Sequence, residues 1–153
     1  MKTEILFPEV ANLCGDLMNV TYLRQCCPEM EVVETGLKDR PAFLDGGVDL
    51  VYVGSATERG LQLMVKALAP YRAELERYVD GGGLMLATGN ALDALGEYVV
   101  IDGKRAFDGL GILKTHAEYH MMKRHNSFLL GSFQDMEIVG FKSLFGHTYP
   151  DDE

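Results

Sequence analysis

The segment Leu84–Gly96 (LMLATGNALDALG) has the pattern of a buried strand that turns into a helix at a glycine. Many α/β enzymes carry a nucleophile at such a turn, because the sharp bend exposes one side chain at the edge of the sheet. This segment contains no Cys, Ser or His, and its candidate reactive side chains are Thr88 and Asp93. A threonine hydroxyl is a poor nucleophile unless a base lies beside it, so the alternative role of Thr88 is that of a small residue at a strand end.

Cysteine is the other residue type that could attack a substrate. Cys14 follows the first predicted strand, in a loop that would approach the carboxyl ends of the strands, where open α/β sheets bind ligands. It is a second candidate nucleophile, weighed against the role of a small apolar residue. Cys26 and Cys27 are adjacent rather than spaced as C-x-x-C, and no His cluster lies nearby. We therefore expect no metal site and no cofactor.

Composition narrows the class of protein. The formal net charge of −9 argues against a nucleic-acid partner, because phosphate binding needs clustered Lys and Arg. No apolar stretch approaches the roughly 20 residues of a membrane span. The first ten residues lack the apolar core of a secretory signal, so we expect a cytoplasmic protein.

The order of elements predicts a doubly wound, flavodoxin-like α/β fold with a mainly parallel sheet, formed by one domain over residues 1–153. Strands are expected at 4–7, 30–36, 48–54 and 84–89, with helices at 12–27 and 57–79, the second of them broken or kinked at Pro70. The second half is β-rich and expected to be antiparallel, laid against the edge of the first. It begins with a hairpin that turns at Asp102-Gly103, followed by strand-like segments at 111–122, 126–133 and 136–145, and residues 149–153 form a frayed tail.

Four segments, in order along the chain, resemble the cobyric acid synthase-type, class I-like glutamine amidotransferase domains. They fit best the glutaminase subunits that act with a Mur-ligase-like synthetase on lipid II. The four segments are LFPEVANLCGDLMNVTYLRQ, VDLVYVGSATERGLQ, DGLGIL and VGFKSLFGHTY. The residues of the first segment that match the family are Asn12, Leu13, Gly15, Asp16, Asn19, Leu23 and Arg24.

The resemblance also shows what this chain lacks. The family's elbow reads G-x-C-x-G-x-Q, and the ungapped register puts Gly89 at the position of the nucleophilic Cys, with Asp93 in place of Gln. A shift by one residue puts Thr88 there instead. The family's GGGS loop becomes Gly54-Ser55-Ala56-Thr57 here, so side chains stand where bare backbone should meet the substrate. A polar loop role for Ser55 is favoured over a role as substitute nucleophile.

The resemblance puts the family's catalytic His and its acidic partner on a segment after the motif that ends at Tyr149. The sequence stops at Glu153, and we therefore expect a truncated amidotransferase-like domain without the general base. His147 lies inside the motif and is a poor substitute. His116, His120 and His125 are expected to have strand-surface roles.

Three functions remain open at this point. The first is a non-catalytic domain that binds a partner protein, such as a Mur-ligase-like synthetase. The residues expected to bind the partner are Asn12, Gly15, Asp16, Asn19 and Arg24. The structural alternative is that Asn12 caps the first helix and that Asp16 pairs with the N-terminus of this helix or with solvent. The second is an active glutamine amidotransferase or amide hydrolase with a relocated nucleophile. The third is a small-molecule module that senses glutamine.

The expected remnant of the ligand pocket consists of Gly54, Ser55, Ala56, Asn90, Arg59 and Arg124. Exposed apolar sheet surface is expected to favour a homodimer or a heteromeric complex.

Overall fold

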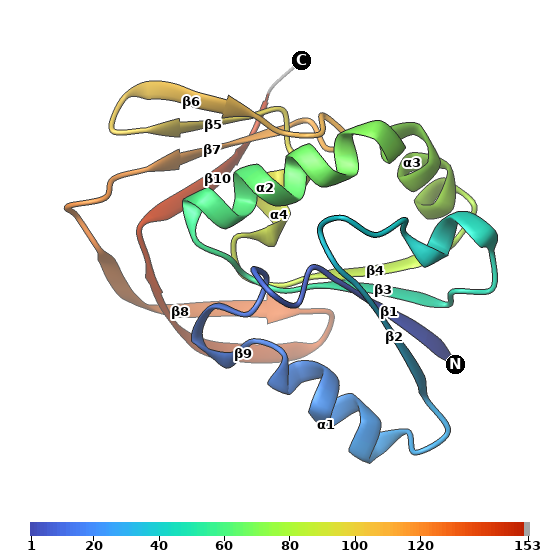
Figure 1. Cartoon of the computed structure of the whole chain (residues 1–153). Coiled ribbons are helices and arrows are strands. Elements are labelled where there is room, and N and C mark those ends of the chain that lie inside the picture. Colours follow the sequence, from blue (N-terminus) through green and yellow to red (C-terminus); the bar gives the residue numbers. More distant parts are fainter. Residues whose placement is uncertain (152–153) are drawn as a thin grey trace.

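The structure, a computed structural model, describes residues 1–151. The first half of the chain forms a four-stranded, fully parallel sheet with strand order β2-β1-β3-β4 (Figure 1). Its strands are β1 (Lys2–Leu6), β2 (Glu31–Thr35), β3 (Leu50–Val53) and β4 (Leu84–Ala87). This order is compatible with a flavodoxin-like fold, in which ligands bind outside the carboxyl ends of the strands. The predicted α/β class and the four predicted strands are confirmed.

Helices lie on both faces of this sheet (Figure 1). Helix α1 (Met18–Cys26) covers one face, where Val20 packs with the sheet residues Ile5 and Tyr52. Helices α2 (Glu58–Leu68) and α3 (Arg72–Asp80) cover the other face over a larger apolar core. A 3-10 turn that contains Pro70 separates them, as predicted from the missing N–H of proline.

The first helix begins later than the sequence suggested. Residues from Asn12 were expected to be helical, but Leu13–Gly15 form a short 3-10 turn and α1 begins at Met18. The reason is the backbone: Cys14 and Gly15 have φ values of +58° and +79°, which no right-handed helix contains. A further 3-10 turn, Ala42–Asp45, is held by the buried carboxylate of Glu4, which accepts hydrogen bonds from the N–H groups of Ala42 and Phe43.

The second sheet has strand order β10-β7-β5-β6. It consists of β5 (Tyr98–Ile101), β6 (Lys104–Asp108), β7 (Thr115–Tyr119) and β10 (Gly146–Pro150). The predicted β5–β6 hairpin is confirmed, and its turn residues Asp102 and Gly103 both have positive φ, as a type I′ turn requires.

The expected antiparallel pairing is confirmed for β5–β6 and β7–β10. The β5–β7 pair is parallel, because residues 109–114 cross the start of β5, where Tyr98 pairs with both Asp108 and His116. Two further expectations are wrong. The second sheet is separate from the first rather than added to its edge. Tyr149 and Pro150 are not frayed, since they pair with His116 and Thr115 in the ladder between β10 and β7. Asp152 and Glu153 lie outside the described residues.

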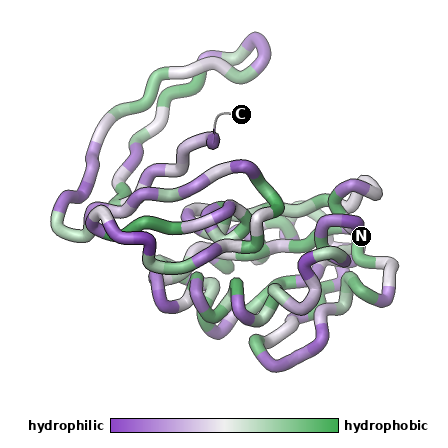
Figure 2. The backbone as a smooth tube through the Cα atoms, turned by 90° about the horizontal axis from the view of Figure 1, so that it is seen from above, coloured by the Kyte–Doolittle hydropathy of each residue, from purple (hydrophilic) through white to green (hydrophobic). Residues whose placement is uncertain are grey.

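Strands β8 (His125–Phe133) and β9 (Met136–Leu144) pair with each other as a separate two-stranded ribbon. Figure 2 shows this ribbon, here called the β8–β9 arm, extending away from the rest of the chain. Its large apolar side chains are exposed to solvent, among them Phe128, Leu130 and Val139. Exposed apolar sheet surface also occurs on β4, where Leu84 and Leu86 point outward.

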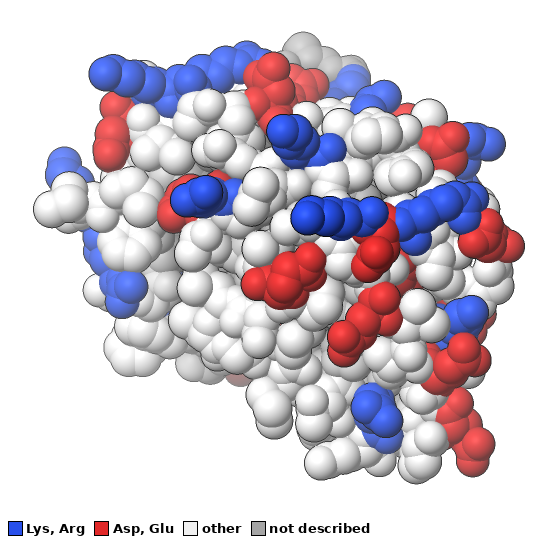
Figure 3. All heavy atoms as spheres, in the orientation of Figure 1, with Lys and Arg blue, Asp and Glu red and all other residues white. Residues whose placement is uncertain are grey.

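Charged side chains of both signs are interspersed over the face shown in Figure 3, which carries no large basic area. No helix within residues 1–151 is long and apolar enough to cross a membrane.

Candidate functional site

The turn between β4 and α4 (Ala91–Leu95) has the shape that the sequence predicted. The strand ends at Ala87, and Gly89 stands at the apex of the turn with a φ of +54°. A side chain in this left-handed region is strained, and nucleophile elbows hold their reactive residue in such a turn. Of the two registers considered, the one that puts Gly89 at the nucleophile position therefore fits the backbone better than the one that puts Thr88 there.

The space beside Gly89 is filled by Ser55, from the loop that follows β3. A Cβ atom placed on Gly89 would lie 2.8 Å from the Cβ of Ser55, a distance that real Cβ atoms essentially never show. Gly54 is even closer to its surroundings, because a Cβ there would lie 2.2 Å from the carbonyl oxygen of Ala11. The elbow apex thus packs against the Ser55 side chain, and Gly54 packs against the backbone of Ala11.

The backbone N–H groups of the loop after β3 already have protein partners. The N–H of Ser55 donates to Oδ2 of Asp16 at 2.6 Å. The N–H of Ala56 donates to Oδ1 of Asn90 at 2.9 Å, and the Asn90 amide donates back to the carbonyl oxygen of Ala56 at 2.8 Å. A tetrahedral intermediate needs free N–H donors to hold its oxyanion. In this conformation these two donors are occupied.

Asp16 organises the network beneath this loop. Its Oδ2 also accepts the hydroxyl of Thr88 at 2.6 Å, and its Oδ1 accepts the Asn19 amide at 2.7 Å. Partial burial works against ionisation, but the hydrogen bonds from Ser55, Thr88 and Asn19 outweigh it and lower the pKa of Asp16. Tyr52 adds a hydroxyl that donates to the Asp16 carbonyl oxygen at 2.8 Å. A carboxylate with a lowered pKa is a weak base, so this arrangement does not activate Thr88.

Of the remaining residues of the first motif, Asn12 and Gly15 belong to the turn before α1 and Arg24 lies at the end of that helix. The side chain of Asn12 accepts the N–H of Leu17 at 3.0 Å, just before α1. Gly15 has positive φ, and Arg24 is exposed in the last turn of α1. Asn12 thus makes a local hydrogen bond, but it does not cap α1 as the alternative expected, because the N-cap residue of α1 is Leu17.

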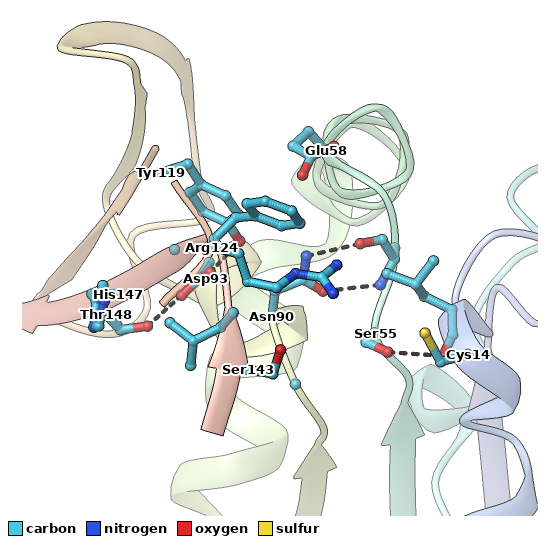
Figure 4. A pocket seen from close by; sticks show the side chains of 16 residues that line it. Cys14, Ser55, Glu58, Asn90, Asp93, Tyr119, Arg124, Ser143, His147 and Thr148 are labelled. Atoms are coloured by element: carbon cyan, nitrogen blue, oxygen red, sulfur yellow. Dashed lines mark hydrogen bonds between the residues drawn. The ribbon is translucent and has the colours of Figure 1, made fainter. Parts of the chain in front are cut away.

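A cavity of about 620 Å³ opens beside the elbow (Figure 4). This volume lies within the range of small-molecule sites. The cavity is bounded by the turn before α1, the loop after β3, the elbow and the β9–β10 connection. Its lining residues are Leu13, Cys14, Ser55, Ala56, Glu58, Gly89, Asn90, Asp93, Tyr119, Arg124, Ser143, Leu144, Phe145, Gly146, His147 and Thr148.

Most of the predicted pocket residues meet at this cavity. Ser55, Ala56, Asn90 and Arg124 line it, as do Cys14 and Gly89. Gly54, Arg59 and Thr88 are not among the lining residues: Gly54 is buried against Ala11, and Arg59 is exposed on α2 one position beyond Glu58, which does line the cavity. Gly54 and Arg59, which were predicted to line the pocket, therefore lie outside its lining.

Asp93 on α4 lies buried at the base of the cavity. Its Oδ2 accepts the hydroxyl of Tyr119 at 2.5 Å, and its Oδ1 accepts the hydroxyl of Thr148 at 2.6 Å. Burial raises the pKa of Asp93, although these two hydrogen bonds oppose the shift. Burial, together with the nearby Asp93 carboxylate, also raises the pKa of Tyr119. Asp93 thus ties the elbow helix to β7 and β10. Sequence reasoning missed Tyr119 and Thr148, because they lie 26 and 55 residues from Asp93 along the chain.

Charged groups of both signs stand at the mouth of the cavity. Arg124 is exposed and extends across it with its guanidinium 4.6 Å from the centre of the Phe145 ring (Figure 4). Glu58 faces the cavity from the first turn of α2. Burial and the positive charges of Lys142 and two further histidines lower the pKa of His147. The mouth could therefore hold a carboxylate and an ammonium group at once.

The expectation of a surface role is wrong for His116. Its ring stacks between Tyr98 and Tyr149, with ring centroids 5.0 and 5.6 Å away, and Nδ1 is bonded to Asp151. The side chain is only 17% exposed, so His116 is a packed structural residue. No cluster of three or more His, Cys, Asp or Glu side chains within residues 1–151 could hold a metal ion.

An elbow after β4, a glycine-containing loop after β3 and a cavity beside them place a candidate site at the carboxyl ends of the parallel strands. The comparison with known proteins supports a glutamine amidotransferase-like relationship. The chain is similar to subunit GatD of lipid II isoglutaminyl synthase (glutamine-hydrolyzing) from Staphylococcus aureus (strain N315), with 28% identity over 145 residues. The match covers 92% of this chain and spans 58% of the length of the staphylococcal subunit. No protein-family profile matches the chain.

Proposed function

We propose that this chain is a glutamine amidotransferase-like subunit that binds but does not hydrolyse glutamine, and that it acts as the binding subunit of a larger cytoplasmic amidating enzyme. A Mur-ligase-like synthetase is the partner proposed, since the similar staphylococcal protein is a subunit of an enzyme that acts on lipid II.

The observation that carries this proposal is the contact between Gly89 and Ser55. A thioester mechanism needs a thiolate at the elbow and free N–H donors for the oxyanion. The apex residue here has no side chain, and Ser55 occupies the adjoining space. The N–H of Ser55 is bound by Asp16, so both requirements are unmet in the same place.

The test is ammonia release from glutamine, measured with the chain alone and after co-expression with a Mur-ligase-like synthetase. With the chain alone, we expect no ammonia release above the buffer control. With the complex, we expect no ammonia release that depends on this chain. Release that disappears in Cys14→Ala or Thr88→Ala would contradict the proposal and favour a relocated nucleophile. In that case Cys14 is the stronger candidate, because it lines the cavity and Thr88 does not.

Glutamine binding without turnover is the part of the proposal that the cavity supports. Arg124 suits the α-carboxylate and Glu58 suits the α-ammonium group of a free amino acid. These two side chains stand on different elements at one cavity mouth (Figure 4).

Calorimetric titration with glutamine tests this binding. We expect heats that saturate and that return to baseline after each injection. Arg124→Ala should abolish them, whereas the matched control Arg59→Ala should not, since Arg59 is also exposed but does not line the cavity. Sustained heat after each injection would show turnover. Equal losses in both variants would contradict the assignment of Arg124.

A further inference from the structure

The β8–β9 arm exposes apolar side chains on a ribbon that is too thin to bury them. In the ladder, Phe128 faces Phe141 and Leu130 faces Val139, so these four side chains share one face, here called the apolar face of the arm. They are 62–81% exposed. An isolated two-stranded hairpin is marginally stable in water, and exposed apolar patches of this kind mark interaction sites.

The exposed area matches one side of a protein–protein interface. The two phenylalanines of the apolar face, Phe128 and Phe141, are 81% and 62% exposed. At roughly 200 Å² for each ring side chain, they expose roughly 290 Å², and Leu130 and Val139 add further apolar area to the same face. One partner in a standard interface buries roughly 800 Å², of which rather more than half is apolar. The arm therefore offers about the apolar area that a stable dimer needs.

Charge along the apolar face is arranged so that the arm complements itself. The ladder places Glu137 opposite Ser132 near the tip, on the same face as Phe141. Arg124 lies at the other end, where its guanidinium covers Phe145, the residue that continues β9 after Leu144. Two arms packed face to face and antiparallel, with the two-fold axis near Phe128 and Phe141, bring Arg124 of one copy toward Glu137 of the other.

The overall charge of the chain favours contact at the arm. The whole chain carries a net charge of −9, so two copies repel each other over most of their surface. Residues 124–144 contain two cations, Arg124 and Lys142, and two anions, Asp135 and Glu137. The arm together with the preceding Arg124 is therefore a neutral region on an acidic chain, and two copies can meet there without this repulsion.

We propose that the β8–β9 arm is the interface between two copies of this chain, which associate as a two-fold dimer through the apolar faces of their arms. The arrangement is isologous, so each copy contributes the same four apolar side chains and one Arg124 and one Glu137 at opposite ends. It leaves α1 outside the interface.

Sedimentation velocity over a wide concentration range tests this interface with the full chain. The wild type should form a dimer, and Phe128→Ser should raise its dissociation constant by at least about tenfold, because it removes an aromatic residue from the centre of the interface. Phe128 is exposed, so far-UV circular dichroism should be unchanged. The matched control is Tyr22→Ser on α1, which removes a similarly exposed aromatic ring and should leave the dimer intact.

A charge exchange between two variants tests the antiparallel register. In Arg124→Glu every dimer contains two acidic pairs, and in Glu137→Arg every dimer contains two basic pairs, so each variant alone should be monomeric. Mixing the two variants should restore a dimer, since both contacts then join opposite charges. A wild type that stays monomeric at all concentrations, or that associates only with the synthetase, overturns the proposal. A mixture that remains monomeric overturns the register. Both sedimentation experiments are run without glutamine, so their results do not depend on whether Arg124 also binds that ligand.

Discussion

Replacing Gly89 by alanine tests whether Ser55 closes the elbow. The new Cβ would adopt a φ of +54° and lie 2.8 Å from the Cβ of Ser55. The left-handed backbone costs about 1 kcal/mol, and the overlap adds about 1–2 kcal/mol. We therefore expect Gly89→Ala to lower the free energy of unfolding by about 2–3 kcal/mol.

The second mutation separates these two contributions. Ser55→Gly removes the Cβ that the new methyl group would touch, and its own cost is about 1 kcal/mol from added backbone freedom. In the double variant, only the backbone strain should remain of the cost of Gly89→Ala. The two mutations should therefore couple by about 1–2 kcal/mol, a size expected for residues in contact.

Urea denaturation followed by circular dichroism measures all four proteins at one concentration, because association also changes apparent stability. Tyrosine fluorescence provides a second probe, since the chain has seven tyrosines and no tryptophan. Costs that simply add would refute the reasoning: they would show that Ser55 does not occupy the space beside Gly89.

The remaining predictions concern the carboxylates and hydroxyls around the elbow. The pKa of Asp93 is raised above 3.8, so the contribution of this carboxyl group to folding stability is fully present below pH 3.8 and is lost as pH rises through the raised value. Over that pH range the wild type should lose stability relative to Asp93→Asn, which urea titrations at a series of pH values would measure. Asp16 should show the opposite slope: its pKa is lowered from 3.8, so Asp16→Asn should cost about 2 kcal/mol at neutral pH, and the difference should vanish as pH falls through the lowered value. Thr88→Val should cost about 1 kcal/mol in urea denaturation through loss of the bond to Asp16, and it should not change ammonia production. Asn90→Ala should cost about 1–2 kcal/mol, because it leaves the backbone groups of Ala56 without their amide partner, and thermal unfolding would detect this.

Local chemistry predicted much of the fold. Asp102-Gly103 indicated a hairpin turn and Pro70 indicated a helix break, and both are present. Such signals can be read from sequence because each depends on the backbone preference of one or two residues. The start of α1 could not be read this way. The apolar spacing from Leu13 is helical, but the positive φ of Cys14 delays the helix.

The candidate site was predicted in its outline and not in its contacts. The sequence indicated an elbow at Gly89 and a changed loop at Ser55, yet gave no sign that the two touch. It also gave no sign that Tyr52, in an apolar strand, reaches the loop that holds Asp16. Backbone pattern is local, whereas contacts between loops depend on how neighbouring strands are ordered in the sheet.

The sequence by itself determined the order of strands and helices from β1 to β9, the glycine at the apex of the elbow and the acidic charge of the chain. Only the tertiary structure decided that Asp93 is buried between Tyr119 and Thr148, and that the apolar strands β8 and β9 are exposed. An apolar strand has the same pattern whether or not another layer covers it. Burial is therefore a property of the surroundings, and it becomes known only when the packing of distant segments is known.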